Sequence, residues 1–457
     1  MDFCPNYYRV RDFGDKCFLT TDHGSYCVVS KDDFRKLQAL QLEEPLLSRL
    51  VEREIVLTEK NIREAIRLAQ ARHNFLFSGT SLHIIVATLR CNMNCLYCQS
   101  SSRPADETSY DMDVSTATKV VDFIFQSPRK NLSIEFQGGE PLLNWDVVLH
   151  IIRYAKEKSK AFFRNVCFSL VTNLVLMDDD KMKFLVENDV GVCTSLDGPR
   201  EIHDSLRRLA GGSSFEHVAM WVPRLNSYYR NSSSRRRCHA LLTLARPALL
   251  YPEKIVDSYA SLGFGSIHIR PLNNLGVAQR MWPELCYPAE EFIQFWKRAI
   301  SYIEQLQSRG VQMRERIYSL IHNKILGTNQ EDYLDLRSPC GAAIGQLAYN
   351  YNGDIYTCDE ARMVSEELFR LGNVKEDNYK DVLTCDKACA VVNASINDQY
   401  YCNECAYKPY CGICPVCNYV EQGSVIAKIP QTDRCKIYRQ QFDHVVKEKF
   451  INDRSRW

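Results

Sequence analysis

Three closely spaced cysteines are the residues of this 457-residue chain that most directly indicate chemistry. Cys91, Cys95 and Cys98 lie in the stretch CNMNCLYC, directly after the apolar run 82–89. The run predicts a buried strand, and the cysteines lie on the loop that leaves its end. Three thiolates can hold a [4Fe–4S] cluster and leave one iron without a protein ligand. Such an open iron gives a reactant a place to bind, like the open position of a catalytic metal.

A zinc knuckle or an accidental grouping of thiols is the alternative interpretation of this loop. Structural zinc sites usually combine paired C-x2-C units with a fourth ligand nearby. Neither Gln99 nor the serines that follow it would serve as that ligand. The triad therefore favours an iron–sulfur cluster.

Polar and glycine residues follow the next predicted strands. After the strand at 131–136 comes Gln137 and then Gly138-Gly139-Glu140. Paired glycines let the backbone approach a ligand closely, and a carboxylate such as Glu140 accepts from an ammonium group. Asn173 follows the strand at 165–171, and its short polar side chain suits a ribose or a carboxylate. This part of the chain thus predicts a ligand site at the strand ends.

The fourth strand ends in a further polar segment, SLDGPREIHDSLR, from Ser195 to Arg207. A guanidinium forks onto a carboxylate, so Arg207 is a candidate carboxylate ligand rather than a surface salt-bridge residue. Asp197 is expected to organise the loop. The basic run 233–237 is expected to form a solvated loop.

The C-terminal third carries a second block of cysteines. Cys340 and Cys358 flank a predicted hairpin whose Asn352-Gly353 suits a two-residue turn. The remaining cysteines of this block follow at short spacings: Cys402, Cys405, Cys411, Cys414, Cys417 and finally Cys435. Zinc is an alternative for the group at 402–411 because C-x2-C units also suit that metal. The triad upstream favours iron–sulfur clusters here too.

Alternating strands and helices must position these residues. Strand patterns occur near 82–89, 131–136, 165–171, 190–195, 238–244 and 266–271, with helical patterns between them. This alternation predicts an α/β fold with parallel strands. Six such units fit an open, partial (β/α)6 TIM-like barrel, whose active site lies at the carboxyl ends of the strands. We expect the barrel over 81–280, a helical bridge over 281–335 and a cysteine-rich domain over 336–457.

Residues 1–80 predict a separate unit of three short strands and three helices. Its strand patterns are Arg9–Phe13, Lys16–Thr21 and Ser25–Val29, and Ser30 with Asp33 predicts a helix start. The unit resembles the winged-helix-like precursor-recognition domain of enzymes that modify ribosomally made peptides. That resemblance implies that a leader peptide adds as a strand to the edge of the sheet. The alternative is a purely structural cap.

Composition excludes several classes of protein. Lys plus Arg is 57 and Asp plus Glu is 56, so the chain gives no indication of binding nucleic acid or an anionic membrane. No apolar run approaches the roughly 20 residues of a membrane span. Twenty cysteines without a secretion signal favour reduced thiols and metal over disulfides. We therefore expect a cytoplasmic protein.

The triad with Tyr97, the Gly-Gly-Glu-Pro motif at 138–141 and the segment at 195–207 together resemble the radical S-adenosylmethionine (radical SAM) enzymes. The resemblance implies that the open iron binds the amino and carboxylate groups of S-adenosylmethionine. An electron from the cluster then releases a 5′-deoxyadenosyl radical. The cofactor contacts implied by the resemblance are Tyr97, Gln137, Gly138, Gly139, Glu140, Asn173, Ser195 and Arg207.

The C-terminal cysteines resemble the SPASM pattern, with Gly353 and Cys358 as its G-x4-C step. The resemblance implies two auxiliary [4Fe–4S] clusters, and so three clusters in all. It assigns the outer cluster to Cys402, Cys405, Cys411 and Cys435. It assigns the inner cluster to Cys340, Cys358 and a thiol from Cys414 and Cys417. The expected last position is Pro415, so either thiol or both remain possible: one leaves an open iron, and both close the cluster.

Asp359 directly follows Cys358. A carboxylate beside an inner cluster is suited to take a proton from the substrate as an electron leaves, which is the work of a general base. The Cys-Asp pair resembles one in anaerobic sulfatase maturases, where the aspartate has that role. The alternative is an aspartate that only hydrogen-bonds the cluster loop.

The segments GTSLHIIVATLRCNMNCLYC and YKPYCGICPVCNYVEQG further resemble the radical SAM maturases of the His-Xaa-Ser peptide system. The implied function is oxidative modification of a ribosomally made precursor peptide: a thioether, a C–C or C–O link, or a dehydrogenated residue. An electron donor such as flavodoxin or ferredoxin is then required. The alternatives are a formylglycine-forming sulfatase maturase and, from another class, an iron–sulfur peptide-binding chaperone or electron carrier.

Overall fold

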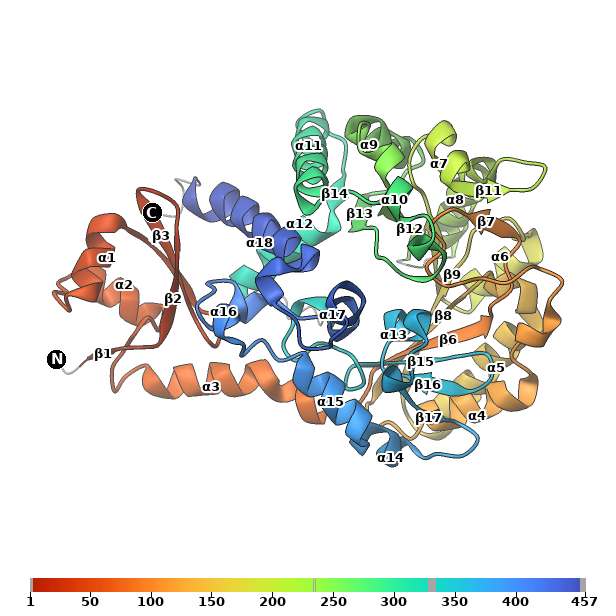
Figure 1. The fold of residues 1–457 in the computed structure, drawn as a ribbon, viewed down its shortest axis with the longest axis horizontal. Helices are drawn as coiled ribbons and strands as arrows, with labels where there is room; N and C mark the ends of the chain where they lie inside the picture. Colours follow the sequence, from red (N-terminus) through yellow and green to blue (C-terminus); the bar gives the residue numbers. More distant parts are fainter. Residues whose placement is uncertain (1–2, 233, 235, 328–333, 453–457) are drawn as a thin grey trace.

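The computed structural model of the chain describes residues 3–232, 234, 236–327 and 334–452. Six parallel strands form its centre (Figure 1). In spatial order they are β6 (Leu82–Thr88), β8 (Asn131–Gly138), β9 (Asn165–Val171), β10 (Val190–Ser195), β12 (His239–Leu244) and β13 (Ser266–Pro271). The connecting helices are α4 (Val114–Ile124), α5 (Trp145–Ala161), α6 (Asp179–Glu187), α8 (Ser214–Asn231) and α9 (Pro252–Ser261). The predicted partial (β/α)6 barrel is confirmed.

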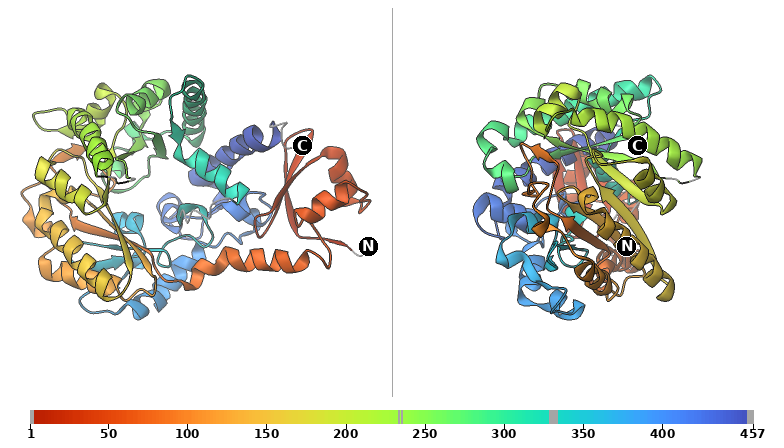
Figure 2. Two further views of the ribbon diagram at one scale, coloured as in Figure 1. Left: turned by 180° about the vertical axis from the view of Figure 1, so that it is seen from behind. Right: turned by 90° about the vertical axis from the view of Figure 1, so that its right-hand side faces the viewer.

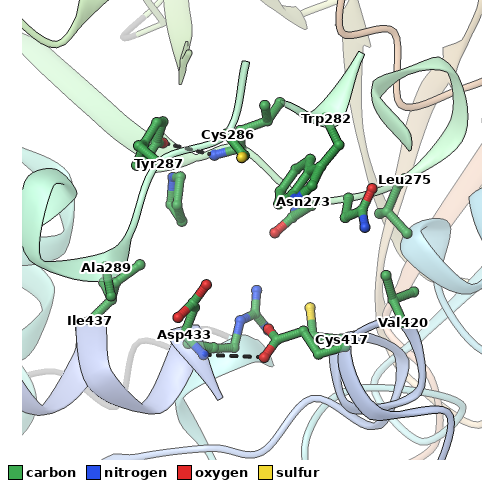
Figure 3. A pocket seen from close by; sticks show the side chains of 15 residues that line it. Asn273, Leu275, Trp282, Cys286, Tyr287, Ala289, Cys417, Val420, Asp433 and Ile437 are labelled. Carbon is green, nitrogen blue, oxygen red and sulfur yellow. Dashed lines mark hydrogen bonds between the residues drawn. The ribbon is translucent and has the colours of Figure 1, made fainter. Parts of the chain in front are cut away.

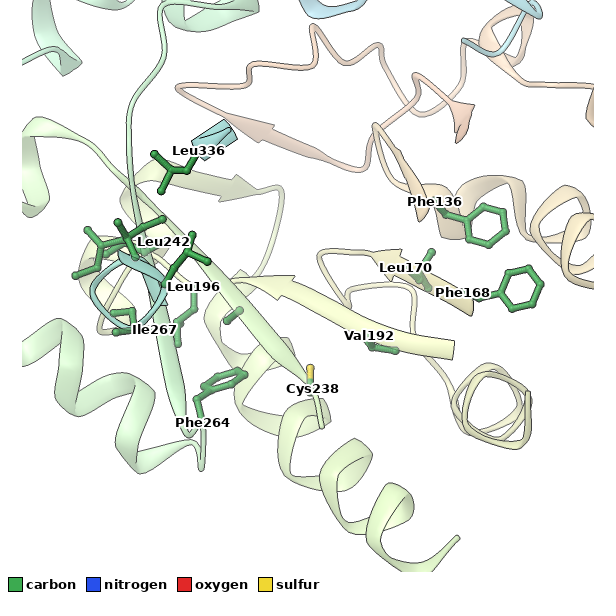
Figure 4. Packing of buried hydrophobic residues seen from close by; sticks show 14 of the residues in the cluster. Phe136, Phe168, Leu170, Val192, Leu196, Cys238, Leu242, Phe264, Ile267 and Leu336 are labelled. Atoms are coloured by element: carbon green, nitrogen blue, oxygen red, sulfur yellow. The ribbon is translucent and has the colours of Figure 1, made fainter. Parts of the chain in front are cut away.

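The core lies between the outer face of these strands and the helices. Phe136, Phe168, Leu170 and Leu242 are buried there, and Figure 4 shows such side chains projecting from neighbouring strands. Each large side chain of this kind stabilises the fold by about 1.5–3 kcal/mol through burial. Because side chains alternate along a strand, the residues between them point to the inner face. This alternation leaves the inner face for polar groups.

The central sheet has ten strands, more than the six predicted. β15 (Gln346–Tyr349) pairs in parallel with β6, and β16 (Asp354–Tyr356) and β17 (Arg370–Asn373) follow in antiparallel order. At the other end β14 (Arg314–Glu315) pairs with β13. The cysteine-rich segment is therefore joined to the barrel by backbone hydrogen bonds.

The predicted hairpin exists, but its two-residue turn is wrong. The N–H of Asn350 donates to the carbonyl of Asp354 at 2.9 Å, which leaves the three residues 351–353 as the loop. Gly353 has φ +93°, the left-handed conformation that closes three-residue hairpin loops. The glycine at the turn is predicted correctly. The first strand ends one residue earlier than a two-residue turn requires.

The N-terminal unit has a three-stranded antiparallel sheet of β2 (Tyr8–Asp12), β3 (Lys16–Thr21) and β4 (Tyr26–Ser30). Two helices, α1 (Lys31–Gln38) and α2 (Leu46–Glu52), complete a small core of their own. Ser30 caps α1 as predicted, accepting from the N–H of Asp33 at 3.0 Å. The third helix, α3 (Ile62–His73), runs from this unit toward the barrel (Figures 1 and 2).

The N-terminal unit packs on the C-terminal part of the chain. Thr20 donates to the carbonyl of Ala406 at 2.7 Å, Arg11 pairs with Asp443 of α18 (Asp433–Val446), and the Tyr26 ring lies 5.1 Å from that of Phe450. In the described ranges no helix combines the length and apolarity needed to cross a bilayer.

The remaining elements lie around the central sheet and in the N-terminal unit (Figure 1). The short strands are β1 (Cys4–Pro5), β5 (Val56–Leu57), β7 (Met93–Cys95) and β11 (Arg207–Leu209). The helices are α7 (Arg200–Leu206), α10 (Trp282–Leu285), α11 (Ala289–Ser308), α12 (Arg316–Leu326), α13 (Asp359–Val364), α14 (Tyr379–Thr384), α15 (Asp386–Ala394), α16 (Tyr400–Asn403) and α17 (Pro415–Gln422).

Candidate active site

A cavity of about 710 Å³ lies on the inner face of the barrel. The cysteine triad and the residues at the strand ends line it together. The predicted residues on its wall are Cys91, Cys95, Cys98, Tyr97, Gln137, Gly138, Gly139, Glu140, Asn173, Ser195, Arg207 and Asp359. Elements far apart in sequence thus place the predicted site residues around one space.

Backbone and ionic contacts hold the cysteine loop in place. The Arg90 guanidinium donates to both oxygens of Asp111 at 2.8 and 2.6 Å, and the N–H of Cys91 donates to the Arg103 carbonyl at 2.8 Å. β7, which ends at Cys95, pairs with β11. Burial raises the pKa of Cys91 above its usual range and that of Cys95 to about 11. Thiols in such a place ionise only against a cation, which fits a metal cluster.

The glycine pair touches the backbone that leads into the cysteine loop. A Cβ built on Gly139 would lie 2.0 Å from the carbonyl oxygen of Arg90, and one on Gly138 would lie 2.3 Å from that of Thr88. Gly138 also has φ +128°, which other residues rarely adopt. These two positions require glycine, and they bring the Glu140 loop against the cysteine loop.

Glu140 is 1% exposed and accepts three hydrogen bonds. Its Oε1 accepts from the Leu142 N–H at 3.1 Å and the Thr172 hydroxyl at 2.7 Å, and its Oε2 from the Asn173 N–H at 2.8 Å. Burial raises its pKa to about 7, and the hydrogen bonds only partly offset this effect. The carboxylate is therefore held rigidly beside the cavity and favours a cationic ligand.

Asp197 is fully buried and connects the polar residues of the fourth strand end. Its carboxylate accepts from the Tyr97 hydroxyl, from Arg207 Nε at 2.8 Å and from the Thr243 N–H at 3.3 Å. The guanidinium of Arg207 also lies over the Tyr97 ring, at 5.2 Å from its centroid. Asp197 thus organises the loop, as expected from the sequence, and orients Arg207 and Tyr97 toward the cavity.

Sequence reasoning missed a second set of residues on the cavity wall: Glu135, Cys193, Arg236, His239, His268, Arg316 and Glu360. Arg270, as its place at the end of the sixth strand indicates, also lies on this wall. The expectation that the run 233–237 is only a solvated loop is wrong for Arg236. The strand period offered a signal, because Glu135 and Cys193 lie two residues before Gln137 and Ser195 and so face the same side.

Two of the thiols predicted to hold the inner auxiliary cluster, Cys358 and Cys414, lie at helix N-termini. Cys358 caps α13 and accepts from the Ala361 N–H at 3.4 Å, and Cys414 caps α17 and accepts from the Cys417 N–H at 3.5 Å. Helix N-termini stabilise thiolates. The Cys417 thiol also donates to Cys414, which lowers the pKa of Cys414. Burial, with a further contribution from Cys414, raises the pKa of Cys340 to about 12.

The outer auxiliary thiols line a cavity of about 280 Å³: Cys402, Cys405, Cys411 and Cys435, together with Cys414. Burial raises the pKa of Cys402 to about 12 and that of Cys435 to about 11. Within the described ranges no three His, Cys, Asp or Glu side chains are arranged to hold one metal ion. The four outer thiols nevertheless face one space, as shared ligands of one cluster would.

Asp359 is engaged in an ion pair. Its Oδ1 accepts from Nε of Arg362 at 2.9 Å, Nη2 of Arg362 lies 2.9 Å from the same oxygen, and both side chains are buried. The neighbouring Glu360 pairs with Arg270 at 3.3 Å. Asp359 therefore lies beside the inner thiols and on the cavity wall, with a cation already on one oxygen.

Comparison with known proteins identifies the barrel. The Radical SAM superfamily profile matches residues 85–235. The chain contains a radical SAM domain and resembles the SPASM-type radical SAM maturases. It is 24% identical over 341 residues to a cysteine-type anaerobic sulfatase-maturating enzyme of Clostridium novyi, covering 72% of this chain and 86% of that one. A [4Fe–4S] cluster and S-adenosylmethionine are the cofactors of this superfamily.

Two solved structures share the fold of this radical SAM protein. Native anSMEcpe with bound AdoMet has a TM-score of 0.67 at 20% identity, covering 82% of this chain and 98% of its own. Streptococcus suis SuiB bound to precursor peptide SuiA has a TM-score of 0.56 at 13% identity, covering 92% and 97%. At these identities, both similarities show a shared fold and no more.

Proposed function

We propose that this protein abstracts a hydrogen atom from a ribosomally made precursor peptide and modifies the peptide oxidatively. The product is a thioether, a C–C or C–O crosslink, or a dehydrogenated residue. The observation that carries the proposal is the single cavity lined by the cysteine triad, the strand-end motifs and Asp359. The two relatives with solved structures are named as binding peptides: SuiB with its precursor, and anSMEcpe with an added peptide.

The residues of the cavity divide the binding work. Cys91, Cys95 and Cys98 hold the catalytic cluster, which with S-adenosylmethionine supplies a 5′-deoxyadenosyl radical when both are bound. Glu140 would accept hydrogen bonds from the amino group of S-adenosylmethionine, and Arg207 would stabilise its carboxylate. Asn173 and Ser195 would bind the ribose of the cofactor. The other polar residues of the cavity wall would contact the peptide.

The inner and outer thiols would hold two auxiliary clusters, and such clusters would supply a route for the further electron that makes the net reaction an oxidation. Both Cys414 and Cys417 contribute to the inner cluster, because the two thiols contact each other beside Cys340 and Cys358. Asp359 takes the proton released as that electron leaves, with Arg362 holding its carboxylate in place. In an assay of product formation, Asp359→Asn should slow the reaction, and an unchanged rate removes this role.

A groove beside the N-terminal sheet suits the leader of the precursor. It measures about 590 Å³ and lies between edge strand β4, the end of α2 at Arg49–Arg53, and Leu326 with Phe450. The N–H of Thr21 donates to the Ser25 carbonyl, so every second residue of β4 pairs with β3. Tyr26 and Val28 then point their backbone groups outward, where an added strand can pair with them.

Binding of the leader should protect β4 from hydrogen exchange. We expect amides of Tyr26–Ser30 to exchange at least ~10-fold more slowly with saturating precursor, because a new strand covers the outward N–H groups. The opposite edge strand β2 serves as the internal control and should not change. Exchange measured by mass spectrometry tests this prediction, and protection of β2 alone would contradict it.

Cofactor affinity should depend on pH through Glu140. Its pKa of about 7 means that below this pH the carboxyl must lose a proton before it accepts an ammonium group, so affinity falls by about tenfold per pH unit. Affinity for S-adenosylmethionine, measured by calorimetry, should therefore rise with pH up to about 7 and level off above it. Glu140→Gln should bind more weakly and lose the acidic limb; an unaltered limb would exclude Glu140.

The experiment that tests the function is anaerobic co-expression with candidate peptides. Peptides containing His-Xaa-Ser repeats or cysteines that are encoded beside this gene are the first choice. Mass spectrometry should show loss of a hydrogen pair at each modified site, with 5′-deoxyadenosine formed in parallel. Deoxyadenosine without any change in the peptide would keep the radical chemistry and refute the assumed substrate.

Oxidation of Cys or Ser to formylglycine is the second candidate, favoured by the similarity to the sulfatase-maturating enzyme over 72% of the chain. Such an enzyme needs no leader. Removing residues 1–80 would expose the surface around Ala406 and Asp443, so the β4 groove is better tested with point variants. Arg53→Glu in the groove should weaken peptide modification and leave formylglycine formation unaffected, with Arg63→Glu on α3 as the control.

A further inference from the structure

Arg434 is a buried cation between the two groups of auxiliary cysteines. It lines one cavity with Cys417 and another with Cys414 and Cys435. Figure 3 shows the Cys417 thiol projecting into the first of these cavities, which Asn273 and Trp282 close from the other side. The side chain of Arg434 is 18% exposed.

The contacts of Arg434 with described residues neutralise it only in part. Nη2 lies 3.8 Å from Oδ2 of Asp335, near the limit of an ion pair, and the guanidinium lies 5.6 Å from the centroid of the Tyr438 ring. Cys417 and Cys414 share cavities with Arg434 and, as thiolates, would add negative charge around it. A buried cation needs such neighbours, because desolvation without a counter-charge is costly.

We propose that Arg434 is a positioning residue that raises the reduction potential of the inner auxiliary cluster. This inference depends on the proposed function, which assigns that cluster to Cys340, Cys358, Cys414 and Cys417. A cluster held by thiolates carries net negative charge, and this charge grows by one when the cluster takes up an electron. A fixed cation nearby therefore favours the reduced state, and burial weakens the solvent screening that would hide its effect.

Arg434 also borders the outer thiols, so a second cation on the same helix is needed for comparison. Arg439 and Lys436 act on the outer thiol Cys435, and Arg439 is exposed. Exposed charges are strongly screened by water. Arg439 lies five residues beyond Arg434 on α18 and therefore offers a matched control with the same side chain, helix and substitution.

A higher potential at the inner cluster would serve the reaction. Asp335, the partner of Arg434, also lines the cavity of the candidate active site, so this ion pair connects that cavity to the auxiliary thiols. An electron leaving the substrate radical moves more readily to a cluster of higher potential. Arg434 would thus help to pull the electron away from the peptide.

The test is a redox titration of the auxiliary clusters followed by electron paramagnetic resonance. The parent is full-length protein with Cys91, Cys95 and Cys98 replaced by Ala, so that only auxiliary clusters contribute signals. Arg434→Gln should move the midpoint potential of one auxiliary signal to a more negative value, and Arg434→Lys should retain most of the parent potential. Arg439→Gln should leave that signal unchanged.

A further variant covers the case in which Arg434→Gln loses its cluster. Asp335→Asn removes the carboxylate that opposes Arg434, so the same midpoint should shift in the positive direction. If Arg434→Gln and Asp335→Asn both keep their full iron and sulfide content and both show the midpoint potential of the parent, the inference is overturned. Absence of auxiliary iron in the parent would instead refute the proposed function, and chemical analysis of iron and sulfide distinguishes the two results.

Discussion

Alanine at Cys91, Cys95 and Cys98 together is expected to lower cleavage of S-adenosylmethionine at least ~1,000-fold, the scale of removing a catalytic unit. The three thiols lie on one loop at the mouth of the cavity, and within the described part of the chain no other cysteines share that loop. Their removal takes away every protein ligand of the catalytic cluster, so no electron can reach the cofactor. Anaerobic production of 5′-deoxyadenosine with dithionite measures the loss.

Three exposed cysteines supply the control for this variant. Cys4, Cys167 and Cys389 are exposed, and none of them lines the cavities that border the cysteine groups. Their joint replacement by alanine should leave cleavage and iron content within twofold of the parent, roughly the scale of surface substitutions. The triad variant should lose the iron of one cluster. If it still cleaves S-adenosylmethionine after that loss, the assignment of the catalytic cluster to Cys91, Cys95 and Cys98 is disproved.

Gly139→Ala is expected to lower affinity for S-adenosylmethionine by at least ~100-fold, equivalent to about 2.7 kcal/mol. The added Cβ would meet the Arg90 carbonyl oxygen at 2.0 Å, and that oxygen also accepts from the Glu140 N–H at 2.7 Å. Backbone cannot move aside as a flexible side chain does. Either the cysteine loop or the Glu140 loop must shift, and the two then no longer face the same ligand.

Gly212→Ala is the matched control because its Cβ meets only Leu209 at 3.6 Å, an ordinary contact. Equilibrium dialysis with S-adenosylmethionine measures both variants, and thermal unfolding of the same samples separates loss of binding from loss of fold. Wild-type affinity in a folded Gly139→Ala protein would show that the two loops are not required to touch.

Local patterns were enough to predict the barrel. Runs such as 165–171 and 190–195 are apolar at every second position or throughout, and polar or glycine residues follow them at once. Strand and helix periods depend on neighbouring residues only, so one sequence suffices to see them. The cysteine triad, Glu140 and Arg207 were found for the same reason: each lies at the end of a recognisable strand.

The extension of the sheet by β15, β16 and β17 could not be predicted in this way. β15 begins more than 250 residues after the strand that it joins, and β6 was already paired with β8 on its other side. Nothing in the local pattern of Gln346–Tyr349 names its partner. Such long-range pairing depends on how the whole chain packs.

The sequence alone determined the kinds of chemistry: thiol groups for clusters, glycines for close approach, and a carboxylate and a guanidinium for a zwitterionic cofactor. Only the tertiary structure decided which groups share a space. Asp359 reaches the cavity wall because the β15–β16 hairpin adds to the barrel sheet, and Arg434 reaches both auxiliary groups through α18. Burial then set their electrostatics, because a charge is costly or effective according to the water that packing removes.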